Sequence, residues 1–273
     1  NNFNNLKPLF RNYLSFTDNH YKHDLHQYYI LSFINPENNI LSITDKINQL
    51  PLVEEVSFNY KMKAFVTPND TYYDTQWALN NTGQAISYNG NTVGTPGADI
   101  DAERAWDITT GSSDVVIAIL DTGIDLDHPD LQSGIVGGYD FVSNDSNAND
   151  GNMHGTACAS IAAGRTNNLI GVSGICWDCS LMPVKVLSDD GYGDFDDIIN
   201  GVVWASDNGA QVISMSLGGG GYVSSFDNAI DYAHDNGTIV ISASGNDNGS
   251  ISYPAAYDNS LAVGAMSPCN ERK

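Results

Sequence analysis

The stretch Val115-Val116-Ile117-Ala118-Ile119-Leu120-Asp121-Thr122-Gly123 decides the fold of this chain. Its first six residues form a continuous apolar run rich in β-branched side chains, which is typical of a parallel strand covered on both faces. An acidic residue ends the run, so we expect Asp121 at the carboxyl end of a buried strand. Ligands of open α/β sheets bind beyond that end.

Strand and helix patterns alternate after this stretch. Pro183 weakens the start of one strand, because a proline nitrogen cannot donate to a ladder. Strands separated by helices predict an α/β fold with a mostly parallel sheet and helices on both faces. We expect strands over residues 181–187, 211–217, 238–243 and 261–266, and helices over 154–163, over 196–207, and from Ser224 or Ser225 to 236–237.

Residues 1–65 differ from the rest and are rich in Asn and charged residues. A strand over 28–33, a helix over 40–50 and a strand over 53–58 predict a small α+β domain of βαβ type. His20, His23 and His26 have a three-residue spacing that could present ligands on a helix, but we favour a polar terminal segment. The chain is therefore expected to hold two domains, over residues 1–65 and 66–273.

The composition excludes some functions. The formal net charge is −22, and no basic stripe exists to displace counterions from phosphates, so we expect no nucleic-acid partner. No apolar run approaches the length of a membrane span, so we expect no membrane partner. The acidic surface suits a soluble secreted protein and calcium binding, although solvation explains most of the charge. The first residue is Asn1, as expected of a protein whose signal peptide has been removed or of a fragment.

The four cysteines are too few for a disulfide scaffold. Cys176-Trp177-Asp178-Cys179 is a lone CxxC motif, whereas a zinc site would need a second pair. A local disulfide formed in an oxidising compartment is favoured over a redox motif. Cys269 has no evident partner.

Several polar groups are predicted at one edge of the sheet. Asp121, Ser216 and Asn246 end or follow strands, and His154 begins a helix. Each has an ordinary structural explanation, as a turn residue or a partly exposed cap. Their placement at the same edge favours a functional site.

In combination, the motifs resemble those of subtilisin-like serine proteases, the subtilases, and of their thermitase branch. The resemblance covers residues 66–273 and implies a subtilisin-like fold that is incomplete at the C-terminus, preceded by a propeptide-like domain that acts as chaperone and inhibitor. Its motifs are Asp121-Thr122-Gly123, His128-Pro129-Asp130-Leu131, His154-Gly155-Thr156, Ser214-Met215-Ser216-Leu217-Gly218 and Ser244-Gly245-Asn246.

The resemblance implies a role for each catalytic residue. His154 would be the general base, Asp121 would orient its ring, and Asn246 would donate its amide to the oxyanion. No Gly-Thr-Ser-x-Ala-x-Pro segment occurs before Lys273, so we expect the chain alone to be inactive and the serine to lie further on. Ser173 is rejected as the nucleophile because it precedes a strand instead of following one.

Substrate and calcium sites are also implied. The family lays an extended peptide between two backbone segments, here Gly191, Tyr192 and Gly193 on one side and Ser216, Leu217 and Gly218 on the other. Gly218 and Gly245 suggest an open pocket for a large apolar side chain.

Oxygen ligands suitable for calcium form two sets. In the second of the two sets listed below, Ser143 stands where an aspartate is expected, so the smaller number of charges should weaken calcium binding. A solvated acidic loop is the alternative for that set. Cys158 resembles the free cysteine of this branch and is interpreted as a packed residue. The first set is Asp70, Asp130 and Asn168, and the second is Asp140, Asp145, Asn147 and Asn149.

The function predicted is that of a secreted, monomeric, calcium-stabilised serine endopeptidase, with peptide or protein substrates and its own propeptide as partners. A catalytically dead subtilase-like binding module is the alternative, and the nucleophile segment discriminates between them. A calcium-binding adhesion or structural domain would leave His154 and Asn246 unexplained.

Overall fold

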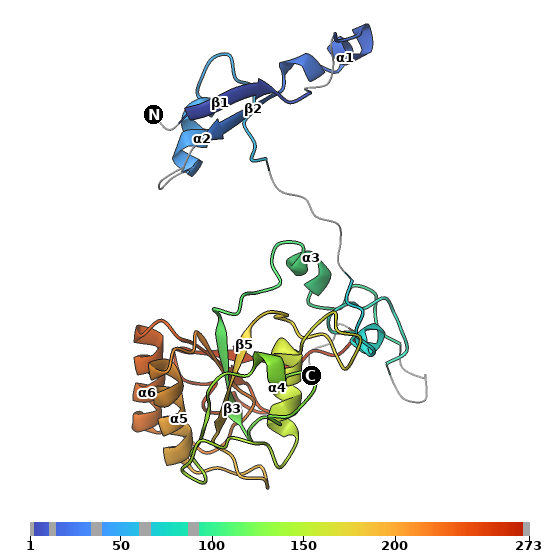
Figure 1. Cartoon of the computed structure of the whole chain (residues 1–273). Helices are drawn as coiled ribbons and strands as arrows, with labels where there is room; N and C mark the ends of the chain where they lie inside the picture. The colour runs from blue at the N-terminus through green and yellow to red at the C-terminus, as the bar shows by residue number, and fades with distance from the viewer. Residues whose placement is uncertain (1–2, 11–14, 34–39, 60–66, 87–92, 270–273) are drawn as a thin grey trace. The chain divides into compact units, whose positions relative to one another are not determined.

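The computed structural model describes residues 3–10, 15–33, 40–59, 67–86 and 93–269 (Figure 1). The chain divides into two compact units, Asn1–Lys63 and Ala64–Lys273. The boundary expected after residue 65 lies outside the described residues, and each unit is considered by itself.

The first unit pairs two antiparallel strands, β1 (Phe3–Pro8) and β2 (Tyr29–Phe33). The strand predicted over 28–33 and the helix predicted over 40–50 are confirmed, the latter as α2 (Ile40–Asn48). The strand predicted over 53–58 is wrong, because the described residues 51–59 form none. Its apolar residues are spaced by three and then by two, so they do not define one face of a strand. The predicted βαβ unit is therefore wrong: in the described residues, α2 follows an antiparallel pair of strands and leads to no third strand.

The histidine spacing has no single helical face to support it. Helix α1 (Asp18–Lys22) contains only His20, and a 3-10 helix, η1 (Leu25–Gln27), contains His26. His20 Nδ1 accepts a hydrogen bond from the backbone N–H of Thr17 at 3.0 Å. This ring therefore has a local structural role at the start of α1.

The second unit contains a six-stranded sheet in the order β4-β5-β3-β6-β7-β8, and all its ladders are parallel. The α/β prediction is confirmed. The strands are β3 (Val116–Asp121), β4 (Tyr139–Asp140), β5 (Ser180–Lys185), β6 (Val212–Met215), β7 (Ile239–Ala243) and β8 (Ser260–Val263), and the helices are η2 (Tyr73–Thr75), α3 (Ala102–Trp106), η3 (Gln132–Gly134), α4 (His154–Ala163), α5 (Phe195–Asp207) and α6 (Ser224–Asp235).

Strand β3 is buried on both faces, as its apolar run predicts. Ala118 and Leu120 belong to the core that includes residues of α5 and α6, whereas Ile119 belongs to the core that includes residues of α4. Figure 1 shows α5 and α6 on one side of β3 and β5, and α4 on the other. The alternation of side chains along a strand thus places helices on both faces. No helix in the described parts of the chain has the length and apolar character needed to cross a bilayer.

Strand β5 accommodates Pro183 because the ladder on one side skips it. Towards β3, Pro183 pairs with Ile119. On the other side, the bridges involve Leu181 and then Val184 and Lys185. The missing N–H of the proline therefore falls between paired positions, which reconciles the residue with the predicted strand.

Helix α6 begins differently from the prediction. Ser224 or Ser225 was expected to begin this helix as its cap, but the residue before the helix is Val223, which makes no side-chain cap bond. Tyr257 replaces the cap, since its hydroxyl oxygen accepts the Val223 N–H and its O–H donates to the Val223 carbonyl, both at 3.1 Å. A residue more than thirty positions away thus holds the start of this helix. The final strand is also shorter than predicted and ends at Val263.

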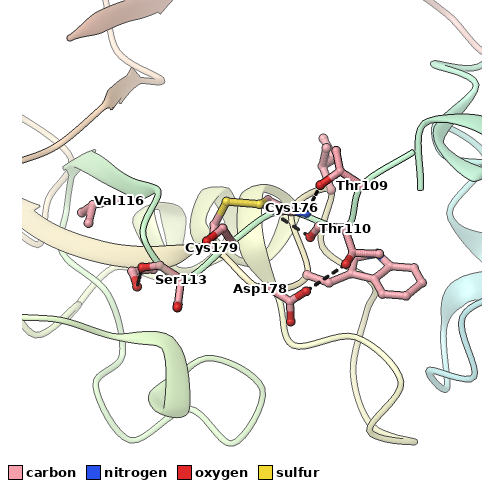
Figure 2. The surroundings of a disulfide bond; sticks show 12 residues. Thr109, Thr110, Ser113, Val116, Cys176, Asp178 and Cys179 are labelled. Carbon is pink, nitrogen blue, oxygen red and sulfur yellow. Dashed lines mark hydrogen bonds between the residues drawn. A yellow bond between two sulfur atoms is a disulfide. The ribbon is translucent and has the colours of Figure 1, made fainter. Parts of the chain in front are cut away.

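The CxxC motif forms a disulfide between Cys176 and Cys179, as the sequence favoured (Figure 2). The Thr110 hydroxyl donates to Asp178 Oδ2 at 2.9 Å, and Arg165 donates to the carbonyls of Trp177 and Cys179. The bond therefore closes a short loop whose carbonyls hold a guanidinium. Cys158 and Cys269 are free.

We predict that replacing both Cys176 and Cys179 with alanine lowers the melting temperature. A disulfide that closes so short a loop contributes about 2 kcal/mol through chain entropy. For a unit of this size, this corresponds to roughly 4–8 °C. Differential scanning fluorimetry checks this, with Cys269→Ser as the control for loss of a free thiol. A double variant that melts with the control would show that the bond does not stabilise the fold.

Candidate active site

Asp121 and His154 meet where β3 ends and α4 begins. The His154 Nδ1 lies 2.7 Å from Asp121 Oδ1. Asp121 is fully buried, whereas the His154 side chain is 49% exposed. A neutral imidazole in this arrangement donates Nδ1–H to the carboxylate and leaves Nε2 as an acceptor. The ring is thus oriented as a general base requires.

Small residues allow α4 to approach β3 closely. A Cβ on Gly155 would collide with the Gly123 carbonyl and lie 3.1 Å from the Cβ of Asp121. Ala159 and Ala163 are fully buried on the same helix. The His-Gly-Thr sequence followed by alanines is therefore what lets His154 reach the end of β3.

A cleft of about 500 Å³ opens beside His154. It brings together the two backbone segments predicted to bind an extended peptide, at residues 191–193 and 216–218. Its remaining walls are largely apolar. The lining residues are Thr122, Asn152, His154, Leu187, Gly191, Tyr192, Gly193, Phe195, Ile198, Ser216, Leu217, Gly218, Gly219, Gly220, Phe226, Tyr253 and Pro254.

The oxyanion residue and the second pocket glycine lie outside this lining. Asn246 lies in the loop after β7, is exposed, and makes no hydrogen bond with any described residue. A Cβ on Gly245 would lie 2.6 Å from Ser252 Oγ, and one on Gly218 would lie 3.5 Å from Ser252 Cβ. The space between the two glycines is therefore bounded by a serine, which the sequence reading missed.

Cys158 lies one turn after His154 on α4. Burial raises the pKa of its thiol, the Ser216 hydroxyl acts in the opposite direction, and the nearby Asp121 carboxylate adds to the rise. The ligand atoms of Asp121, His154 and Cys158 lie within 4.8 Å of one another, a grouping found nowhere else in the described part of the chain. A thiol held protonated is a poor nucleophile, so the packed interpretation of Cys158 agrees with its surroundings.

The first calcium set comes together around one loop. Asp70 accepts hydrogen bonds from the backbone N–H groups of Asn167 and Asn168, at 3.0 and 3.3 Å. Asp130 accepts one from Asn168 Nδ2 at 2.6 Å and another from the Val172 N–H at 3.1 Å. Both aspartates are buried, and neither forms an ion pair with a described cation.

The backbone of this loop leaves oxygen atoms unused. Asn167, Leu169 and Gly171 have positive φ angles of 64°, 70° and 57°. The carbonyls of Leu169 and Gly171 accept hydrogen bonds from Thr71 and Tyr72. The carbonyls of the alternate residues Thr166, Ile170 and Val172 accept none from the described residues. Two buried carboxylates beside unpaired carbonyls form a donor set that fits calcium.

The second calcium set is occupied by turn hydrogen bonds. Asp140 Oδ1 accepts the Ser143 N–H at 2.9 Å, and Asp145 Oδ1 accepts the Asn147 N–H at 2.7 Å. Asn149 Oδ1 accepts the Leu126 N–H at 3.2 Å. Three of the four side chains thus already accept backbone N–H groups, one of them from Leu126 outside this loop.

Asp150 is a site residue that the sequence reading missed. Burial by itself raises the pKa of its carboxyl group, but hydrogen bonds from Thr156, Asn152 and Met153 outweigh it and hold the pKa below its ordinary value. Lys185 was also missed, and its buried Nζ donates to the Thr122 carbonyl at 2.6 Å and to Asp189 at 2.7 Å. An acidic residue shortly before a helix start is a capping signal that could have identified Asp150.

Known proteins resemble this chain over most of its length. It is 39% identical over 229 residues to a thermophilic serine proteinase of a Bacillus species, covering 84% of this chain and 53% of that protein. It is 42% identical over 208 residues to thermitase of Thermoactinomyces vulgaris, covering 76% and 68%. A solved protease structure from Pseudoalteromonas arctica superposes with a TM-score of 0.66 at 34% identity, covering 76% of this chain and 68% of that one.

The chain thus spans about half the length of the first relative and two thirds of the second. The family model of the subtilases matches residues 112–273, which contain β3, α4, the cleft and the loop after β7. With the Asp121–His154 pair at the predicted edge of the sheet, this match shows that the chain belongs to the subtilase family.

Proposed function

We propose that this chain provides the base, its orienting carboxylate and the substrate groove of a serine endopeptidase. The single observation that carries the proposal is the 2.7 Å contact between His154 Nδ1 and Asp121 Oδ1 at the edge of the cleft. The buried Asp121 would orient the ring, and the half-exposed His154 would transfer the proton.

The proposed mechanism follows from this geometry. His154 Nε2 accepts the proton of the attacking serine hydroxyl as the oxygen bonds to the scissile carbonyl carbon. Asp121 stabilises the imidazolium that forms, and His154 then returns the proton to the leaving amine. Asn246, exposed after β7, would donate its amide to the oxyanion once substrate is bound. The same base then activates a water molecule, which hydrolyses the acyl-enzyme.

The nucleophile has no candidate in the 273 residues, which contain no Gly-Thr-Ser segment. The family resemblance, and not the end of the sequence, is the basis for requiring such a serine. We therefore propose that the Asp121–His154 pair functions in a protein that includes this segment and that residues 1–273 alone are inactive. The catalytically dead binding module is retained as the alternative, since it would lack the serine.

The substrate proposed is an extended peptide lying between residues 191–193 and 216–218. Glycines on both sides let its backbone approach and pair as in strand addition. Phe195, Leu217 and Phe226 wall the cleft and favour apolar side chains. Secretion is proposed because the chain contains a disulfide. A monomeric state is proposed because the composition is strongly acidic. The first unit is proposed as the propeptide partner.

A serine-directed fluorophosphonate probe tests the proposed activity. The probe reacts with a serine that His154 has activated. We therefore expect no labelling of residues 1–273 and stoichiometric labelling of a version extended by the Gly-Thr-Ser segment. In the extended protein, His154→Ala should abolish labelling, whereas His234→Ala on the exposed face of α6 should not. Intact-mass spectrometry measures the adduct. Labelling of the unextended chain would refute the requirement for an added serine.

Calcium is proposed as a stabilising ligand at Asp70, Asp130 and Asn168. Support comes from two buried carboxylates without a described cation partner and from the unpaired carbonyls beside them. The ion would neutralise those carboxylates and hold the loop through oxygen ligands. The second set is proposed as a weaker site at most, since its side chains already bond to backbone N–H groups.

We predict that saturating calcium raises the melting temperature of the chain. A ligand at 100 times its Kd stabilises the folded state by about 2.7 kcal/mol, which is roughly 5–10 °C for this size. Asp130→Asn should remove most of that gain, whereas Asp235→Ala at the end of α6 should retain it. Fluorimetric melts with and without a chelator measure both. Equal gains in the two variants would place the ion elsewhere, and no gain in any protein would refute the site.

A further inference from the structure

Asp150 lies four residues before His154, and its carboxylate accepts hydrogen bonds from both sides of the active site. We propose that Asp150 is a positioning residue that fixes His154 against Asp121. Its importance for catalysis rests on the proposed function, but its effect on the geometry does not.

One oxygen of Asp150 accepts three hydrogen bonds, from two separate segments of the chain. Its Oδ1 accepts hydrogen bonds from the Thr122 hydroxyl at 2.9 Å and from the N–H groups of Asn152 and Met153 at 2.8 and 3.0 Å. The first donor follows Asp121 on the β3 side. The third directly precedes His154. A single oxygen atom therefore joins the immediate neighbours of both partners in the catalytic pair.

The other oxygen caps helix α4. Its Oδ2 accepts the Thr156 N–H at 3.0 Å and the Thr156 hydroxyl at 2.6 Å. A carboxylate at this position satisfies an N–H of the first helical turn and interacts favourably with the helix dipole. His154, the first residue of that turn, is thereby held on both sides by bonds to the same side chain.

Thr122 carries the restraint to Asp121. This fully buried residue donates its N–H to Asp121 Oδ1 at 2.7 Å. Its hydroxyl donates to Asp150 and accepts the Gly155 N–H at 3.0 Å. The hydroxyl is thus bonded to both the carboxylate and the residue after His154. Removing the Thr122 hydroxyl would break both bonds, whereas removing the Asp150 carboxylate would break the one that it accepts.

The backbone before His154 explains why this restraint affects orientation. Met153 has φ of 95°, in the left-handed region that a non-glycine residue rarely adopts, and the residue is 73% exposed. Its backbone is held by two hydrogen bonds instead, from its N–H to Asp150 and from the Ala157 N–H to its carbonyl, and only the first lies on the side before His154. Without the carboxylate, Met153 is free to return to an ordinary backbone conformation and to rotate the residue that follows it.

Proton NMR of the folded chain tests the proposal without relying on peptidase activity. The His154 Nδ1–H in its bond to Asp121 gives a downfield resonance, assigned by its loss in His154→Gln. We expect Asp150→Ala to remove it or to increase its exchange with water at least tenfold. Thr122→Val should do the same, while Thr122→Ser should restore it because serine retains the hydroxyl. Asp231→Ala, which removes an aspartate acceptor on α6, is the matched control.

The folding state of each variant is measured alongside its resonance. Circular dichroism and melting curves confirm that the variants are folded, and Asp150→Asn with Thr122→Val replaces Asp150→Ala if the latter does not fold. A wild-type resonance and exchange rate in folded Asp150→Ala and Thr122→Val would overturn the proposal. Absence of the resonance from the wild-type chain would instead refute the Asp121–His154 bond and with it the basis of the proposed function. In an enzyme that includes the serine, Asp150→Ala should lower kcat at least tenfold and leave KM unchanged.

Discussion

The structure of the second unit depends on holding a buried carboxylate against an imidazole at the end of its central strand. Asp121 is removed from water, which is costly for a charge unless hydrogen bonds replace its hydration. The Thr122 N–H and His154 Nδ1 both contact one of its oxygens. The other oxygen is buried and has no hydrogen-bond partner among the described residues. The Thr122 N–H and the His154 ring are therefore the contacts that replace water around this carboxylate.

Close backbone approach is the means by which this arrangement is built. Gly155 contacts Gly123 where any side chain would collide, and Ala159 and Ala163 continue the contact along α4. The buried Lys185 adds a cation on the β5 side, where it donates to the Thr122 carbonyl. Truncating such a buried charge would leave its partners unpaired, which costs more than an exposed pair contributes. Helix, strand and polar network are thus mutually dependent.

Local sequence signals predicted the elements that have a clear residue pattern, and they failed where distant partners decide. The run before Asp121 indicated β3, and the small residues after His154 indicated α4. Nothing near Val223 could show that Tyr257 holds the start of α6, and nothing near Gly245 could show that Ser252 bounds its pocket. These contacts join residues far apart in sequence or depend on a loop path.

The site residues follow the same rule. Motif spacing placed Asp121 and His154 at one edge, because parallel strands end together. It did not find Asp150, whose importance lies in the donors it gathers from Thr122 and from the start of α4. The predicted strand over residues 53–58 failed because its apolar residues do not define one face, and β2 has β1 as its partner instead. Hydrogen-bond partnership is thus the information that residue patterns lack.

Helix α4 connects the two charged regions of this unit. It begins at His154 and ends at Ala163, directly before the loop whose N–H groups bind Asp70 and Asp130. The Arg165 N–H in turn donates to the Asp130 carbonyl, and its guanidinium holds the carbonyls of the disulfide loop. An ion bound by the carboxylates would restrain the C-terminal end of the helix that carries the base. Stability of the proposed calcium loop and orientation of His154 would then be coupled through ten residues of rigid helix, without any ligand near the cleft.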